Sequence, residues 1–198
     1  MSKNLIKFWP FLVLLYLTLF TRVINIDELF YFTYDESIPA FVGRRLILWQ
    51  HIPLIGGVTP FNFHLGPYFY WFYALLLAIG KLNPIIWGYA GAAIAMVTTF
   101  LIYKLGDLTG SKKLAITAAI FWATSYLANI YDRHLWALYW GPLISIIVLI
   151  CLYKIIKGKE KFVYPLAITI GLGIHADPSN LVFLILAILV WFIYKLPI

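Results

Sequence analysis

The sequence contains little cysteine and few charged side chains. Its 198 residues include one cysteine, Cys151, and 8 acidic residues, while 63% of the chain is hydrophobic. A lone cysteine inside an apolar run excludes an internal disulfide and argues against a thiolate metal site. The net charge of +7 would suit nucleic acid, but the lysines lie in short segments between apolar runs, as membrane topology requires. Nucleic acid is therefore not an expected partner.

Apolar runs fill most of the chain, and the mean hydropathy is +0.90. Runs near twenty residues suit transmembrane helices, because lipid offers no partners for unpaired backbone groups. The sequence predicts an all-α, polytopic membrane protein of one domain, residues 1–198. The first run lacks a small-residue cleavage site and is expected to remain as an anchor. The six predicted spans are residues 5–24, 84–103, 114–130, 137–156, 163–174 and 181–194.

A seventh apolar run, residues 67–80, is short for a span and is crowded with aromatic residues, which favour the membrane interface. If this run lies at the outer interface, all the lysine-rich segments fall on the cytoplasmic side, as the positive-inside rule requires. We therefore predict a plasma-membrane protein with six spans, both termini in the cytoplasm and its functional face outside. The lysines concerned are Lys3, Lys7, Lys104, Lys112, Lys113, Lys154, Lys157, Lys159, Lys161 and Lys195.

The loop after the first span holds four of the eight acidic residues: Asp27, Glu28, Asp35 and Glu36. Because charged groups near lipid are costly, an acidic cluster at a membrane face indicates a functional site, although a solvated connector is the alternative. This first external loop, about residues 25–83, is predicted to carry an amphipathic helix over 37–50 and an interfacial helix over 67–80. Ser37 is expected to cap the first of these helices.

The order of motifs in this loop carries a resemblance to a known family. Tyr34-Asp35-Glu36 follows the first span, a surface helix and a Gly/Pro turn come next, and Gly66-Pro67-Tyr68-Phe69-Tyr70-Trp71 opens the aromatic helix. This arrangement resembles the amino-terminal module of the GT-C superfamily of membrane glycosyltransferases, with most likeness to protein O-mannosyltransferases and lipid A aminoarabinose transferases. Weaker similarity lies in Gly80-Lys81-Leu82-Asn83-Pro84, Arg133-His134-Leu135-Trp136 and Gly173-Ile174-His175.

The resemblance implies an inverting transferase that moves a sugar from a polyprenyl-phosphate donor to an acceptor hydroxyl at the outer membrane face. It implies that Asp35, or failing that Glu36, is the catalytic base. Asp35 is expected to face a cavity that Arg133 or a histidine also reaches. The candidates for binding the donor phosphate are Arg44, Arg45, His64, Arg133, His134 and His175.

Each of these candidates has a structural alternative. Asp35 could cap the surface helix, and Arg44 and Arg45 could bind lipid headgroups. Arg133 could pair with Asp132 or with the acidic loop, and His175 with Asp177 could cap a helix end. No cofactor is expected. His51 and His64 could in principle join Asp35 and Glu36 around a divalent metal, but no spacing supports a specific ion.

Two other functions compete with the transferase. One is a non-catalytic membrane subunit of the same fold that serves a larger complex; for either function, a second subunit carrying further spans is a possible partner. The other is a small transporter, which would place ionisable or helix-breaking residues midway along its spans. The centres of the predicted spans are almost free of ionisable groups, so the transporter ranks last.

Overall fold

The computed structural model describes residues 3–59, 62–134 and 136–195, with side chains from Trp9 onward. In this part of the chain the regular structure is helical, apart from one isolated antiparallel bridge between Val58 and His64, which confirms the all-α prediction. The α-helices are α1 (Lys3–Val23), α2 (Ile26–Leu29), α3 (Tyr34–Ile47), α4 (Tyr68–Ile79), α5 (Ile86–Leu108), α6 (Lys112–Thr124), α7 (Tyr126–Tyr131), α8 (Gly141–Ile156), α9 (Val163–Ala176) and α10 (Leu181–Tyr194). Three short 3-10 turns are η1 (Ala137–Trp140), η2 (Glu160–Phe162) and η3 (Pro178–Asn180).

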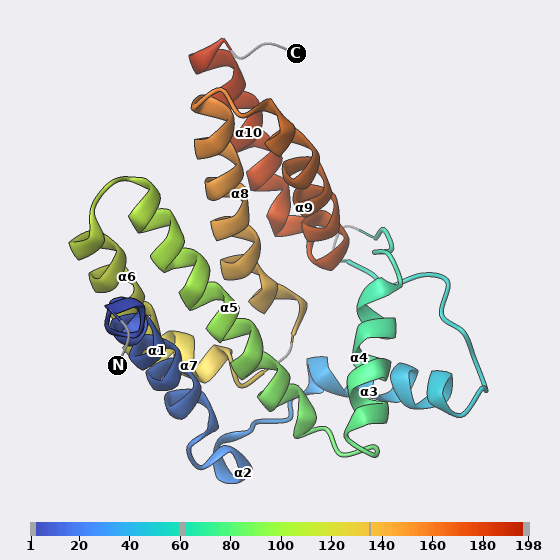
Figure 1. The fold of residues 1–198 in the computed structure, drawn as a ribbon. Coiled ribbons are helices and arrows are strands. Elements are labelled where there is room, and N and C mark those ends of the chain that lie inside the picture. Colours follow the sequence, from blue (N-terminus) through green and yellow to red (C-terminus); the bar gives the residue numbers. More distant parts are fainter. Residues whose placement is uncertain (1–2, 60–61, 135, 196–198) are drawn as a thin grey trace.

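The long helices form two groups that meet between α5 and α8 (Figure 1). Helices α1, α5 and α6 pack together in one group, and α8, α9 and α10 pack together in the other. Helices α3 and α4 pack on each other at one end of the molecule, where α4 also contacts α5 and α9 (Figure 1). The loop that follows α1 therefore lies beside the ends of both groups.

Two helical segments are long and apolar enough to cross a membrane by length and composition, namely Ile86–Leu108 and Ala137–Ile156. Both coincide with predicted spans, and they support membrane association. The other apolar helices of the described residues are shorter: Trp9–Val23, Tyr68–Ile79 and Pro178–Tyr194.

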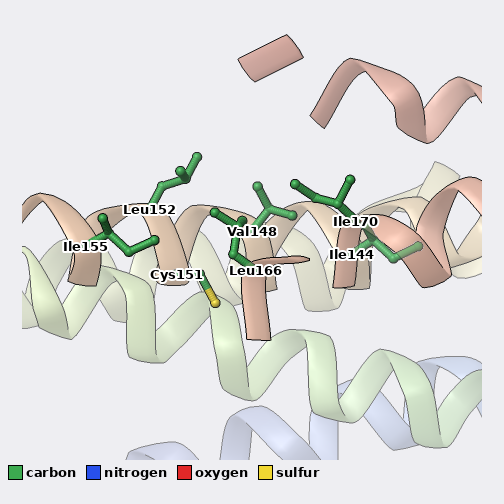
Figure 2. Packing of buried hydrophobic residues seen from close by; sticks show 7 residues of the cluster. All are labelled: Ile144, Val148, Cys151, Leu152, Ile155, Leu166 and Ile170. Atoms are coloured by element: carbon green, nitrogen blue, oxygen red, sulfur yellow. The ribbon is translucent and has the colours of Figure 1, made fainter. Parts of the chain in front are cut away.

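The second group of helices has an apolar core between α8 and α9. Val148 and Cys151 of α8 are buried there together with Leu166 of α9 (Figure 2). Cys151 is a buried free thiol, and it behaves as a small apolar side chain at this position. The full cluster is Ile144, Val148, Cys151, Leu152, Ile155, Leu166 and Ile170.

The segment 114–130, which was predicted to be one spanning helix, is divided into two helices. Helix α6 ends at Thr124 and α7 begins at Tyr126, with Ser125 between them in an extended backbone conformation. The Ser125 hydroxyl oxygen accepts a hydrogen bond from the Ala128 N–H at 3.3 Å. Because this serine caps a new helix, the chain changes direction in the middle of an apolar run.

The predicted start of the surface helix also needs correction. Helix α3 begins at Tyr34, not at Ser37, and Pro39 lies inside it. The buried residues of α3 are Glu36, Pro39 and Gly43. A Cβ on Gly43 would lie 3.2 Å from the Ala74 Cα, so this glycine lets the backbones of α3 and α4 approach closely.

Candidate functional site

Asp35 and His175, which are distant in the sequence, line one cavity of about 300 Å³. The side chains of both residues are exposed. The two residues share a cavity as expected, but the exposure of Asp35 contradicts the expectation that its side chain points away from bulk water. We call this the Asp35 cavity. Its lining comprises Asp35, Ile38, Pro39, Gly56, Gly57, Val58, Thr59, Leu65, Gly66, Phe69, Tyr70, Trp136, Ala137, His175, Ala176, Asp177 and Pro178.

One wall of the Asp35 cavity is the glycine-containing loop before α4. The Gly56 N–H donates to the Leu65 carbonyl oxygen at 2.7 Å, and the Leu65 N–H donates to the Gly57 carbonyl oxygen at 3.0 Å. A Cβ on Gly66 would collide with the ring of His175. The absence of a side chain at Gly66 therefore sets how closely this loop approaches the end of α9.

Helix α4 is fixed beside the cavity by two aromatic hydrogen bonds. The Tyr68 hydroxyl donates to the Leu172 carbonyl oxygen of α9 at 2.7 Å, and the Trp71 Nε1–H donates to the Pro53 carbonyl oxygen at 3.0 Å. Burial raises the pKa of Tyr68 to about 12. These bonds join α4 to α9 on one side and to the preceding loop on the other.

The start of α3 gives the two adjacent acids different surroundings. The Glu36 carboxylate accepts hydrogen bonds from the Thr33 N–H at 2.9 Å and from the Thr33 hydroxyl at 3.3 Å, and its residue is 1% exposed. Thr33 and Glu36 therefore cap the helix, and the alternative in which Asp35 is the cap is wrong. Asp35 lies one position earlier, exposed at the cavity.

Pro39 follows Asp35 by one helical turn, and both residues line the cavity. A proline has no N–H, so the Asp35 carbonyl oxygen receives no helical hydrogen bond from residue 39.

His134 lies against Glu36 and not in the Asp35 cavity. Its Nδ1 is 3.4 Å from the Glu36 carboxylate oxygens. The rings of Phe30, Tyr31 and Tyr139 surround it, with centroids 6.5, 6.3 and 6.2 Å from that of the imidazole. This contact joins the start of α3 to the segment that follows α7.

Among the described residues, Arg133 pairs neither with Asp132 nor with the acidic loop. Its guanidinium donates to the Thr21 carbonyl oxygen at 2.9 Å and to the Arg22 carbonyl oxygen at 3.2 Å, at the end of α1. The carboxylate of Asp132 pairs instead with the Arg22 guanidinium, whose Nη2 atom is 2.9 Å from Oδ2 of Asp132. Burial raises the pKa of Asp132 to about 6, and the charge of Arg22 opposes that rise.

The other phosphate candidates also lie away from Asp35. Arg44 is nine positions further along α3, which places it about 180° around the helix from Asp35. Arg45 lines a separate hollow with Arg44 on that helix. His64 is exposed, with its Nδ1 3.2 Å from the Gly56 carbonyl oxygen. Of the six predicted phosphate ligands, only His175 shares the cavity with Asp35.

The lining of the Asp35 cavity suits a hydroxyl-rich ligand. Its ionisable acids are Asp35 and Asp177, its base is His175, and its lining includes no lysine or arginine. Carboxylates accept hydrogen bonds from ligand hydroxyls. Three aromatic side chains, Phe69, Tyr70 and Trp136, provide apolar surface beside these groups. Among the residues that the structure describes, no group of three or more His, Cys, Asp or Glu side chains could hold a metal ion.

The observed roles of Arg22 and Asp177 were not predicted from the sequence. Arg22 was overlooked, although a charged residue in the last turn of an apolar run is a signal of a buried partner. Asp177 was weighed as a helix cap, and its carboxylate does accept the Ser179 N–H at 2.8 Å. Asp177 also lines the cavity opposite α3, a placement that only the fold could provide.

Comparisons with protein-family models, curated protein sequences and solved structures found no match to this chain. No relative therefore contributes to an assignment of function.

Proposed function

We propose that this chain is a GT-C-type membrane glycosyltransferase, or the amino-terminal catalytic module of one. It transfers a sugar from a polyprenyl-phosphate donor to an acceptor hydroxyl. The observation that carries the proposal is the exposed Asp35 carboxylate at a cavity of about 300 Å³, with His175 on the same cavity. Asp35 is also the residue that the motif Tyr34-Asp35-Glu36 designates.

The chemistry requires a base and a group that stabilises the leaving phosphate. Asp35 takes the proton of the acceptor hydroxyl as that oxygen attacks the anomeric carbon. The bond from the anomeric carbon to the phosphate oxygen breaks, and the lipid phosphate leaves with the electron pair. A ring N–H of His175 donates a hydrogen bond to the departing phosphate. A single displacement of this kind inverts the configuration of the anomeric carbon.

Glu36 is a positioning residue in this scheme. One oxygen of its carboxylate accepts hydrogen bonds from Thr33, and the buried carboxylate lies against His134. Glu36 therefore holds the first turn of α3, while Asp35 is the acid at the cavity. His134 and Arg133 join neighbouring segments to that turn and to α1. Their contribution is to the placement of Asp35 and not to the reacting atoms.

The proposed topology has six spans in the plasma membrane, with both termini in the cytoplasm and α3 and α4 at the outer face. Helix α4 has 12 residues and is crowded with aromatic side chains, which favour the membrane interface. The lysine distribution favours the same arrangement. Helices α5 and α8 are two of the proposed spans, and α1, α6 with α7, α9 and α10 provide the others.

A second candidate is a non-catalytic membrane subunit of this fold, and one observation favours it. Among the residues that the structure describes, no lysine or arginine lines the Asp35 cavity, whereas a leaving phosphate is best stabilised by cationic groups. A partner chain that supplied those cations would complete the site. The two candidates differ in whether the chain alone supports turnover.

The proposal is tested with the full chain reconstituted in vesicles with a polyprenyl-phosphate sugar and an acceptor alcohol. Transfer that depends on the chain and inverts the anomeric centre is the expected result. Absence of transfer, combined with full activity on addition of a second membrane subunit, would favour the accessory function. Absence of transfer under both conditions, across donor sugars, would contradict the proposal.

A further inference from the structure

The carboxyl half of α3 presents two adjacent arginines to the outside of the molecule. Arg44 and Arg45 are exposed, and neither forms a salt bridge within the described part of the chain. Together with Phe41, Leu48 and Gln50 they line a hollow of about 320 Å³ that contains no acidic residue. We call it the arginine hollow.

The two guanidinium groups have different supports. The Cζ atom of Arg45 lies 5.7 Å from the ring centroid of Phe41, one helical turn earlier, which favours an ordered cation over the aromatic face. Arg44 also lines a neighbouring hollow of about 310 Å³ with Leu77, Leu82 and Pro84. Guanidinium groups suit phosphate because their N–H donors match its oxygens in pairs.

Exposed apolar side chains continue from this hollow along the chain. Leu48 is 45% exposed, Trp49 84% and Leu54 77%. Trp49 has a positive φ of 56°, a backbone conformation that is unfavourable for a bulky residue. Cations beside exposed tryptophan and leucine are typical of a surface that lies in the membrane interface.

We propose that the arginine hollow binds the phosphate headgroup of an anionic membrane phospholipid. Charge complementarity favours an anionic phosphate, and the exposed apolar side chains beside the hollow favour a lipid over a free phosphate. The sugar donor does not fit, because Arg44 faces away from Asp35 and the hollow shares no lining residue with the Asp35 cavity. The site anchors α3 to the membrane surface and does not depend on sugar transfer.

The experiment is native mass spectrometry of the purified full chain in detergent, titrated with phosphatidylglycerol, phosphatidylcholine or polyprenyl phosphate. The variant Arg44→Ala/Arg45→Ala should lower the affinity for phosphatidylglycerol by roughly tenfold to thirtyfold, since a cation near an anionic surface contributes about fivefold. The matched control is Lys112→Ala/Lys113→Ala, which removes two adjacent exposed cations elsewhere. It should leave the affinity nearly unchanged.

A third variant, Arg44→Lys/Arg45→Lys, keeps both charges and the helix propensity but loses the guanidinium forks. It should bind phosphatidylglycerol with an intermediate affinity. Full affinity in this lysine variant, or an equal loss in both alanine variants, would show that charge alone is responsible and would overturn the site. A preference of the native chain for polyprenyl phosphate that disappears with the two arginines would assign the hollow to the donor and overturn the phospholipid assignment.

Discussion

Asp35 and Glu36 are neighbours in the sequence, yet the helix gives them opposite environments. Glu36 is 1% exposed and bonded to Thr33, while Asp35 is exposed at the cavity. A base must reach the hydroxyl whose proton it abstracts. One oxygen of Glu36 is used in the helix cap and the other is buried without a hydrogen-bond partner in the described part of the chain, whereas the Asp35 carboxylate is exposed. The capping pair was readable as Thr33 followed three positions later by Glu36, a pattern that marks the start of a helix.

The buried pair of Arg22 and Asp132 gives a residue-scale prediction about stability. Arg22→Met leaves the Asp132 carboxylate buried without its cation, and we expect a loss of about 3–5 kcal/mol in the free energy of unfolding. The double variant Arg22→Met/Asp132→Leu should recover most of that loss, because both charges are then removed. Thermal unfolding in detergent measures both variants. A double variant as unstable as Arg22→Met would contradict this account of the pair.

At the scale of elements, apolar runs predicted most helices closely: the run 181–194 coincides with α10, and the run 137–156 contains α8. Both α5 and α8 arise from long apolar runs, in which a helix pairs every backbone group, and α5 continues to Leu108, beyond the predicted end at 103. The break at Ser125 was missed, since averaged hydropathy does not register one serine that caps a new helix. The buried face of α3 was missed too, because Gly43 packs through its lack of a side chain.

Close packing of α5 on α6 gives a prediction at this scale. A Cβ on Gly106 would collide with the Ala115 Cα, a backbone atom that cannot move aside, so the contact tolerates only glycine. Gly106→Ala should lower the melting temperature in detergent, with a cost of about 1–3 kcal/mol. Gly171→Ala, in α9, is the matched control because nothing lies within 4 Å of its added Cβ. Equal stability of the two variants would contradict the proposed α5–α6 contact.

At the scale of the whole molecule, the functional site assembles from segments that the sequence keeps far apart. Asp35, Trp136 and His175 meet at one cavity, and Arg22 meets Asp132 across the first group of helices. The sequence could nominate Asp35 and His175 by residue type and motif. It could not tell that Arg44 and Arg133 point elsewhere, because that depends on the rotation of α3 and on the packing of α7 against α1.

The proposed topology is testable by labelling single cysteines in a Cys151→Ser background. Gln50 and Lys159 are exposed residues that the six-span arrangement places on opposite sides of the membrane. Gln50→Cys should react with an impermeant thiol reagent from outside intact cells, and Lys159→Cys should react only after permeabilisation. Asp132 is unsuitable as a reporter because it is buried against Arg22. Labelling of Lys159→Cys from outside would contradict the arrangement.

The most direct test of the central claim is the turnover of Asp35→Asn in vesicles with a polyprenyl-phosphate sugar. Asparagine keeps the size of the side chain but cannot take the acceptor's proton, so transfer should fall by about 10²–10⁴-fold with unchanged thermal stability. Asp27→Asn, at an exposed acid of the same loop, should transfer at the native rate. Native-like turnover by Asp35→Asn would contradict the catalytic assignment of Asp35.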